Sequence, residues 1–411
     1  MAIPIEKTIS PKQRRAALHA LFTSHANTNG APPTFLITVP LRICPLGAHS
    51  DHQAGLVTGL TINRSVSLLA RELAEPSAQV WSTHFRESRT TSLAEIPERT
   101  TGDWGNYLRG AAQALQVTNK KLSRGFTGII HGEMPIGGLS SSAAVSIAYL
   151  KALEHVNGLS SSPLETVSLV RKVENGYLGL HNGILDQSVI MSGKRNALSC
   201  IDCSSQTFST LTQGESEVPW EILVVYSGLS RQLTATPFNQ RVAECHEAAR
   251  DLLKLARKSV PEKPLLGDVD EGIFQEFGSR LEAPLRRRAT HFFTERARVR
   301  QGMELWTRGE IENFSKLITA SGESSIVHYE SGSPALISLY EIMAQIPGIL
   351  GTRFCGGGFQ GCALAFIDSR KRDAITESLH AAYTARHPEL ANDYSIHLCE
   401  STDSVTLEAL S

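Results

Sequence analysis

The sequence lacks any apolar run that approaches the roughly 18 residues needed to cross a membrane. It also lacks an excess of charge of either sign, because 40 Lys and Arg residues face 41 Asp and Glu residues and the net charge is −1. This balance gives no electrostatic reason to expect nucleic acid or an anionic membrane as a partner. The first residues, MAIPIEKTISPKQRRAALHALF, lack the apolar centre and small-residue cleavage site of a signal peptide. We therefore expect a soluble, cytoplasmic protein.

Cysteine is also scarce: the seven residues are odd in number, and their spacing shows no dense disulfide framework. Free thiols are therefore expected. Cys200 and Cys203 match the C-x-x-C spacing, but a zinc site would need a second pair of ligands. A thioredoxin-type site would need the motif at the start of a helix, whereas LSCIDC is typical of a strand. Buried structural thiols are the expected role, and a metal or redox site is the alternative.

A chain of 411 residues is too long for one compact core, so two or three domains are expected. The polar stretch SSQTFSTLTQGESEVP predicts a boundary near residues 205–220, which we place between residues 208 and 209. The two parts mix helical and strand patterns, which predicts an α+β fold with two domains of similar size. Hydrophobic periodicity indicates helices over residues 11–24, 104–116, 141–156, 240–258, 292–309 and 334–346, and strands over residues 35–39, 65–73, 125–132, 220–227 and 395–399.

The segment PIGGLSSSAA (residues 135–144) is the most specific local signal. Adjacent glycines let backbone N–H groups turn toward a common point, and the serines open a helix whose first N–H groups carry partial positive charge. Such a loop suits a triphosphate. It has no Walker lysine and is not a dinucleotide G-x-G-x-x-G. The alternative is an ordinary serine-capped helix after a glycine turn.

A phosphate loop without lysine needs a metal ion to neutralise the phosphates. Ser142 could supply a hydroxyl ligand to Mg²⁺, and an acidic residue should complete the site. Glu174, in RKVENGYLG, is the candidate for this residue. The alternative is that Glu174 is merely a solvated residue on a helix.

Three motifs in order give the chain a resemblance to the GHMP kinase superfamily, and specifically to its galactokinase branch. RICPLGAHSDHQAG (residues 42–55) is similar to the family's R-x-N-L-I-G-E-H-x-D-Y-x-G-G, the serine loop is the second motif, and GGGFQGC (residues 356–362) is similar to G-G-G-F-G-G-C. Smaller matches fill the gaps, namely WGNY at 104–107, GILDQ at 183–187, IDC at 201–203 and F-N-x-R-x-x-E-C at 238–245. The resemblance implies a two-domain fold with the active site in the cleft between the domains, and a monomer.

The resemblance also implies a catalytic pair. Asp186 of GILDQ matches the aspartate that takes or orients the proton of the attacking hydroxyl, and Arg42 matches the arginine beside it. Phosphoryl transfer requires mainly positioning and charge stabilisation, which this pair and Mg²⁺ would supply. A purely structural ion pair is the alternative.

The remaining implied roles concern binding of ATP, Mg²⁺ and sugar. Ser142 and Glu174 correspond to the family's magnesium ligands, and Trp104 lies in the neighbourhood of the adenine. The phosphate cradle is formed by Gly137, Gly138, Leu139, Ser140 and Ser141, and the sugar site includes Ala48, His49, Asp51, Gly183 and Phe238. For His49, a role as a buried core histidine is the alternative.

Three departures from the family pattern bear on the substrate. Ala48 replaces a glutamate that in galactokinases accepts a hydrogen bond from the sugar's 6-hydroxyl, and Phe238 replaces a tyrosine that also touches the sugar. The serine loop is one residue shorter than the usual P-x-G-x-G-L. A glutamate would repel a C6 carboxylate by about 4 kcal/mol at ~4 Å and an effective dielectric near 20. Loss of that glutamate therefore favours a uronic acid, whereas Phe238 indicates a pocket that differs even from close relatives.

The galacturonokinase branch of the family carries the same R-I-C-P-L-G-A-H variant and a matching E-N-G-Y-L-G-L-x-N-G-I-L-D-Q stretch, present here at residues 174–187. The resemblance therefore implies phosphorylation of D-galacturonate at C1 by ATP. A uronate needs a cation near its carboxylate, and Arg64 and Arg231 are candidates, with surface positions as the alternative. Other substrates remain open, namely galactose or another C6-modified sugar such as glucuronate. A non-catalytic sugar and ATP sensor is the alternative outside the enzymes.

Overall fold

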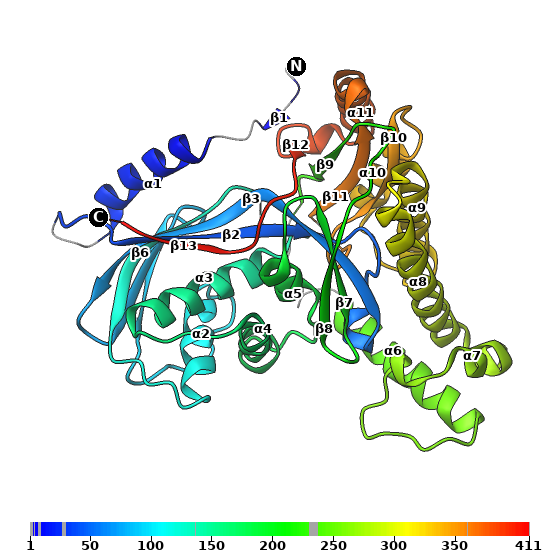
Figure 1. Cartoon of the computed structure of the whole chain (residues 1–411), viewed down its shortest axis with the longest axis horizontal. Helices are drawn as coiled ribbons and strands as arrows, with labels where there is room; N and C mark the ends of the chain where they lie inside the picture. The colour runs from blue at the N-terminus through cyan, green and yellow to red at the C-terminus, as the bar shows by residue number, and fades with distance from the viewer. Residues whose placement is uncertain are drawn as a thin grey trace.

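The computed structural model describes residues 3, 5–6, 10–26, 30–135, 137–229, 237–359 and 361–410. Its frame consists of two separate β-sheets with helices packed against them (Figure 1). The strands are β1 (Ile5–Glu6), β2 (Phe35–Ile43), β3 (Leu56–Leu73), β4 (Ser77–Ser82), β5 (Glu87–Ser92), β6 (Gly125–Gly132), β7 (Ala197–Asp202), β8 (Thr207–Thr212), β9 (Trp220–Tyr226), β10 (Ile349–Phe354), β11 (Cys362–Asp368), β12 (Ser395–Cys399) and β13 (Thr406–Ala409). The helices are α1 (Pro11–His25), α2 (Asn106–Gln116), α3 (Ser141–Val156), α4 (Pro163–Arg171), α5 (Leu185–Ser192), α6 (Phe238–Leu255), α7 (Glu271–Phe277), α8 (Ala283–Thr307), α9 (Ile311–Val327), α10 (Pro334–Met343) and α11 (Arg372–Arg386).

The larger sheet has eight strands in the order β13-β2-β3-β6-β4-β5, with β7 paired to β3 and β8 paired to β7. Strand β3 is 18 residues long and organises this sheet, because it pairs with β2, β6 and β7. Helices α2, α3, α4 and α5 lie on one side of the sheet, and α1 lies on the other side (Figure 1). The apolar strand residues are therefore buried between helices.

The smaller sheet has the order β1-β12-β9-β11-β10. All seven residues of β11 are buried, as expected for a strand that is covered on both faces. Helices α10 and α11 pack together beside this sheet, and α9 packs on β10 (Figure 1). Helix α8 contacts β3 and β8 of the larger sheet and packs on α9, which packs on β10 of the smaller sheet, so α8 and α9 together connect the two sheets.

The predicted α+β fold is confirmed, and several elements have the predicted bounds to within one residue. The segment 141–156 is helix α3, and the strands predicted at 220–227 and 395–399 are β9 and β12. Strand β13 was not predicted: it follows the smaller sheet in sequence but pairs with β2 in the larger one. The domain boundary between residues 208 and 209 stays a prediction.

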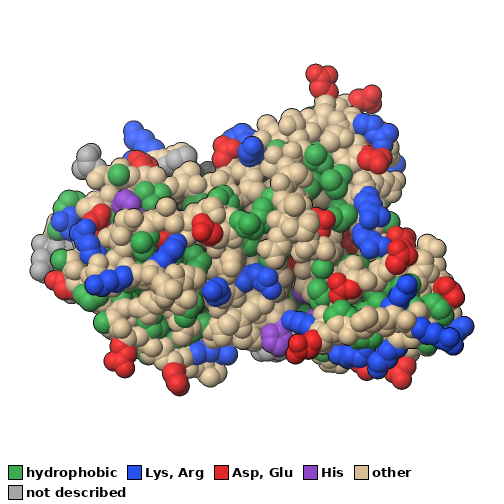
Figure 2. Space-filling view, turned by 60° about the horizontal axis from the view of Figure 1, so that its bottom comes forward, with side chains coloured by type: hydrophobic (Ala, Val, Ile, Leu, Met, Phe, Trp, Pro, Cys, Tyr) green, Lys and Arg blue, Asp and Glu red, His purple; other side chains and the backbone are tan. Residues whose placement is uncertain are grey.

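Positive and negative side chains are interspersed over the face shown in Figure 2, in keeping with the net charge of −1. Among the residues that the structure describes, no helix combines the length and apolar character that a membrane span requires.

All seven cysteines are free thiols, and all but Cys203 are buried. The strand predicted for LSCIDC is confirmed as β7, which contains Cys200. Burial raises the pKa of the Cys200 thiol to about 12, so it is protonated at neutral pH. Within the described ranges, no group of three or more His, Cys, Asp or Glu side chains is arranged to hold a metal ion.

Candidate active site

A cavity of about 590 Å³ contains most of the residues that the sequence motifs single out. Segments far apart in the sequence line it, namely the end of β2, the connection from β2 to β3, the start of α3, and the glycine-rich connection from β10 to β11. The predicted site residues on its wall are Arg42, Ala48, His49, Asp51, Trp104, Gly137, Gly138, Ser140, Ser141, Ser142, Glu174, Asp186 and Phe238. The two others, Leu139 and Gly183, lie just behind the wall.

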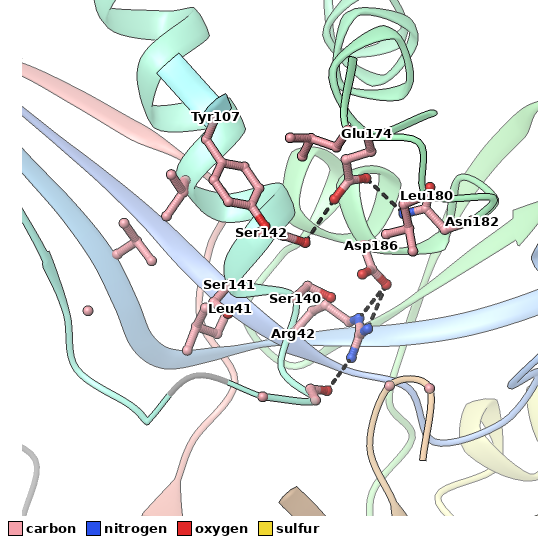
Figure 3. Close-up of a pocket in the computed structure, with 18 of the residues that line it drawn as sticks. Leu41, Arg42, Tyr107, Ser140, Ser141, Ser142, Glu174, Leu180, Asn182 and Asp186 are labelled. Carbon is pink, nitrogen blue, oxygen red and sulfur yellow. Dashed lines mark hydrogen bonds and ion pairs between the residues drawn. The ribbon is translucent and has the colours of Figure 1, made fainter. Parts of the chain in front are cut away.

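Arg42 and Asp186 form an ion pair in this cavity (Figure 3). The Arg42 side chain points from β2, and its Nε and Nη2 atoms donate to Oδ1 of Asp186 at 2.9 and 2.6 Å. Its Nη1 atom donates to the carbonyl oxygen of Gly138 at 3.1 Å. Both donors to the aspartate bind the same oxygen, which leaves the second carboxylate oxygen available to a ligand. Burial by itself would lower the pKa of Arg42, but the Asp186 charge raises it, so the guanidinium stays charged.

The predicted phosphate loop contains three residues with positive φ angles. Gly137 and Gly138 have φ angles of 144° and 78°, and Ser140 has φ = 62°, immediately before α3. The first N–H groups of α3 lie at the end of this loop, and they have no hydrogen-bond partners within the helix. The Ser140 hydroxyl is buried and has no hydrogen-bond partner in the described structure, although it lines the cavity. A ligand with several oxygen atoms would satisfy these donors.

Glycines of the third motif pack directly against this loop. A Cβ atom on Gly137 would lie 2.9 Å from the Cα atom of Gly361, and one on Gly356 would lie 2.9 Å from the Cα atom of Gly138. The two backbones can approach this closely only because neither carries side chains here. The Leu139 side chain packs in the hydrophobic core. Its backbone carbonyl oxygen accepts a hydrogen bond from the Arg42 N–H at 3.4 Å and so ties the loop to β2.

Ser142 and Glu174 meet on the same wall (Figure 3). The Ser142 hydroxyl donates to Oε1 of Glu174 at 2.8 Å, and the Asn182 side chain donates to Oε2 at 2.8 Å. Glu174 lies in a π-helical turn, Lys172–Tyr177, where the sequence predicts an ordinary helix; such turns frequently occur at functional sites. Burial, with a contribution from the Asp186 charge, raises the pKa of Glu174 to about 7. A cation at this position would stabilise the ionised carboxylate.

The connection between β2 and β3 forms the opposite wall. His49 has φ = 59°, and its ring stacks on that of Tyr329 with centroids 3.9 Å apart. Burial, and then His291, hold the pKa of His49 well below its usual value, so the ring is neutral. Ala48 precedes it and presents only a methyl group to the cavity. Ala48 and His49 thus line the same cavity as Asp186, and their contact with a sugar stays a prediction.

Asp51 belongs to the same connection and contacts the start of α5. Its Oδ2 atom accepts from the Leu185 N–H at 3.2 Å, and a Cβ atom on Gly183 would lie 2.5 Å from the same carboxylate. Gly183 therefore leaves the space that Asp51 occupies. Burial, followed by repulsion from Asp186, raises the pKa of Asp51 to about 6.

Aromatic residues line both ends of the cavity. Trp104 stacks with Phe85 at a centroid distance of 5.6 Å and donates from Nε1 to Glu87 at 3.0 Å. Phe238 begins α6 at the other end and meets His52 edge-on at 5.9 Å. Phe85 also lines the cavity, and 46% of its surface is exposed, which is a high fraction for a large apolar side chain.

Arg64, one of the two arginines suggested as carboxylate ligands, does not lie in this wall. Its Nη2 atom donates to the carbonyl oxygen of Leu398 at 3.3 Å. Arg231 lies outside the described residues. Arg353 does line the cavity and is 1% exposed, although sequence analysis did not single it out. Its position in GTRFCGGG, directly before the third motif, was the available signal.

We predict that Asp51→Asn stabilises the protein at neutral and alkaline pH. The pKa of Asp51 is raised in the folded state, so folding is weakened as pH rises from about 4 to 6 and the buried carboxylate ionises. The variant should unfold at a higher temperature than the wild type at pH 8, with the difference shrinking toward pH 4.

Asp103→Asn serves as the control of opposite sign. Although burial opposes it, hydrogen bonds from Arg109 and Arg89 lower the pKa of Asp103 to about 2, so its stabilisation is present above pH 4. This variant should lose stability at pH 8. A larger gain for Asp51→Asn at pH 4 than at pH 8 in calorimetric scans would contradict the prediction.

Comparison with known proteins agrees with this geometry. Residues 106–194, which include the phosphate loop and Asp186, match the family described as the GHMP kinases N terminal domain. A galacturonokinase from Arabidopsis thaliana is 40% identical over 392 residues, covering 90% of this chain and 92% of that protein. A galactokinase from Roseiflexus sp. (strain RS-1) is 29% identical over 377 residues, covering 92% and 93%.

Among solved structures, galactokinase from Lactococcus lactis, in complex with galactose, superposes with a TM-score of 0.86 and 26% identity. The match covers 96% of this chain and 99% of that one. The Lactococcus fold and the Arabidopsis relative agree with the three ordered motifs, and they show that this chain belongs to the GHMP kinases, in the galactokinase branch of sugar kinases.

Proposed function

We propose that this chain transfers the γ-phosphoryl group of ATP to the C1 hydroxyl of D-galacturonate. The observation that carries the proposal is the position of the Arg42–Asp186 pair in one cavity, between the phosphate loop and the wall at Ala48. The 40% identity to a galacturonokinase supports the choice of sugar.

The chemistry follows from this arrangement. Asp186 takes or orients the proton of the C1 hydroxyl, whose oxygen forms a bond to the γ-phosphorus. The bond from that phosphorus to the bridging oxygen breaks, and ADP leaves. Arg42 stabilises the charge that moves during transfer and also fixes the loop through its bond to Gly138. Ser140, Ser141 and the loop N–H groups hold the phosphates, and Trp104 borders the space for the adenine.

Mg²⁺ fits the pair formed by Ser142 and Glu174. Mg²⁺ prefers oxygen ligands and usually takes only one or two from the protein, with waters and phosphates as the others. Ser142 Oγ and Glu174 Oε1 are 2.8 Å apart and face the phosphate loop end of the cavity, which suits shared coordination. When bound there, the ion would neutralise phosphate charge.

Ala48 distinguishes a uronate from a neutral hexose. The family's glutamate at this position would place a negative charge against a C6 carboxylate, whereas the methyl group of Ala48 adds none. A site for a neutral hexose would be expected to keep an acceptor for the 6-hydroxyl, whereas a uronate has no such hydroxyl. The absence of an acceptor at position 48 therefore favours a uronate.

A cluster of buried charges lies behind this wall. Arg353 lines the cavity and pairs with Glu295 at 3.7 Å, and Glu295 also pairs with Arg298 at 2.7 Å. Two arginines thus share one glutamate. The adjacent His49 and His291 have lowered pKa values, caused mainly by burial, and are neutral. This cluster carries one excess positive charge, which a substrate carboxylate or the ionised Asp51 of the same wall would offset.

Three further features predicted from the sequence remain part of the proposal. The protein acts as a monomer in the cytoplasm, and its domains divide near residues 208 and 209 with the active site in the cleft between them. Light scattering of the purified chain tests the first of these features, because a dimer would have twice the mass of 44.7 kDa.

The proposed reaction predicts ADP release with ATP and Mg²⁺ that is fastest on D-galacturonate, in comparison with D-glucuronate and D-galactose. Asp186→Ala should lower kcat by about 10²–10⁴-fold, because a positioned base contributes about that much. Fastest turnover of galactose would keep the kinase and reject the uronate. A folded protein that binds ATP but turns over none of the three sugars would reject the proposal.

A charge placed at position 48 should reverse the preference for sugar. We expect Ala48→Glu to lower kcat/KM for galacturonate about a thousandfold relative to Ala48→Gln, the cost of about 4 kcal/mol of repulsion. The glutamine variant is the matched control, because it fills the same space without the charge. Equal losses in both variants would show that volume, and not charge, sets the preference.

Glu174→Gln should raise the Mg²⁺ concentration needed for half-maximal rate by about tenfold, equivalent to roughly 1.4 kcal/mol of ligand binding. Titration of the rate with Mg²⁺ at saturating sugar measures this, and excess Mg²⁺ should recover part of the lost activity. An unchanged Mg²⁺ requirement would show that Glu174 is not a ligand.

A further inference from the structure

Helix α8 binds two consecutive backbone groups of the sugar-site wall. Glu295 accepts a hydrogen bond from the Gly47 N–H at 2.7 Å, and the Nε2 atom of His291 lies 2.9 Å from the carbonyl oxygen of Ala48. His291 and Glu295 are four residues apart, so they lie on the same face of the helix. Both side chains are buried, at 1% and 0% exposure.

The partners of His291 determine where its proton lies. A carbonyl oxygen can only accept, so Nε2 carries the hydrogen and donates it to Ala48. The other nitrogen, Nδ1, lies 2.9 Å from the Ser324 hydroxyl, which therefore donates to it. Burial lowers the pKa of His291 to about 4, in agreement with a neutral ring. The ring thus holds the wall in one orientation.

The wall needs this external support. Gly47 has φ = 95°, and a Cβ atom there would lie 2.4 Å from the Cα atom of Val57, so no side chain at this position could anchor the turn. Ala48 has only a methyl group. Glu295 is itself held by the Ser321 hydroxyl, Arg298 and Arg353, and His291 is 5.7 Å from His49 between ring centroids.

We propose that His291 and Glu295 are positioning residues that set the affinity for the sugar without touching it. They hold Gly47 and Ala48 from α8 and so place Ala48 and His49 against the substrate. The inference rests on the proposed function only in assigning this end of the cavity to the sugar. The nucleotide end, at Trp104 and Phe85, makes no contact with these two side chains among the bonds of the described residues.

The test compares His291→Phe with His291→Gln. Glutamine places an N–H group near the position of Nε2 and can keep the bond to Ala48, whereas phenylalanine keeps a ring without the donor. We expect His291→Phe to raise KM for the sugar about tenfold to a hundredfold, the effect of leaving a buried carbonyl without its donor. KM for ATP should change less than about twofold, and His291→Gln should recover most of the sugar affinity.

Trp306→Phe is the matched control for lost stability. Trp306 is also buried on α8 and donates from a ring nitrogen to a backbone carbonyl, that of Leu211 at 2.9 Å, which is not part of the cavity wall. This variant should lower the unfolding temperature as His291→Phe does and leave KM for the sugar unchanged. If His291→Phe does not fold, Ser324→Ala, which removes only the hydroxyl at Nδ1, should raise KM for the sugar by about threefold.

Each outcome decides the inference. KM is measured for the sugar that the wild type turns over fastest, so a failure of the galacturonate assignment leaves this test intact. Any of three results would overturn a positioning role. The first is an equal rise in KM for sugar and for ATP in His291→Phe, and the second is a sugar KM that rises as much in Trp306→Phe as in His291→Phe. The third is a sugar KM in His291→Gln that does not recover. An unchanged sugar KM in both His291→Phe and Ser324→Ala would overturn it as well.

Discussion

The ion pair between Arg42 and Asp186 is the interaction on which the active site depends. The guanidinium is 2% exposed, and burial of an unpaired charge would be costly, so its partners have to be in place when the protein is folded. Those partners come from α5 and from the phosphate loop, while the arginine itself comes from β2. One side chain therefore connects the proposed base, the proposed phosphate site and the larger sheet. This explains why the three elements share a single cavity.

Close backbone contact is the second constraint. The phosphate loop and the connection from β10 to β11 touch at glycines whose Cβ positions are already taken. A loop that binds an anion through backbone N–H groups has to expose them, and the opposing glycines allow the neighbouring chain to support the loop without covering those groups. Two segments that lie far apart in the sequence are thereby brought together at the proposed anion site.

The sugar end of the cavity is constructed differently. Its wall consists of small residues with unusual backbone angles, and its support comes from buried polar side chains of α8. Of the two side chains that hold the wall, His291 is neutral and Glu295 is paired with Arg298 and Arg353, and the wall residue Ala48 adds no charge. In the proposed function, the residue at position 48 therefore decides whether this wall presents a negative charge to the sugar.

The sequence by itself determined the family, the α+β fold and most of the cavity wall. Motif residues such as Asp186, Ser142 and Gly138 are recognisable because their chemistry requires those residue types at those places, and α3 and β12 follow from periodicity. The tertiary structure alone decided that Arg353 lines the cavity, that Arg64 does not, and that α8 supports the wall. These contacts join residues more than 200 positions apart, so no local pattern encodes them. Strand β13 was missed for the same reason, since its partner lies at the other end of the chain.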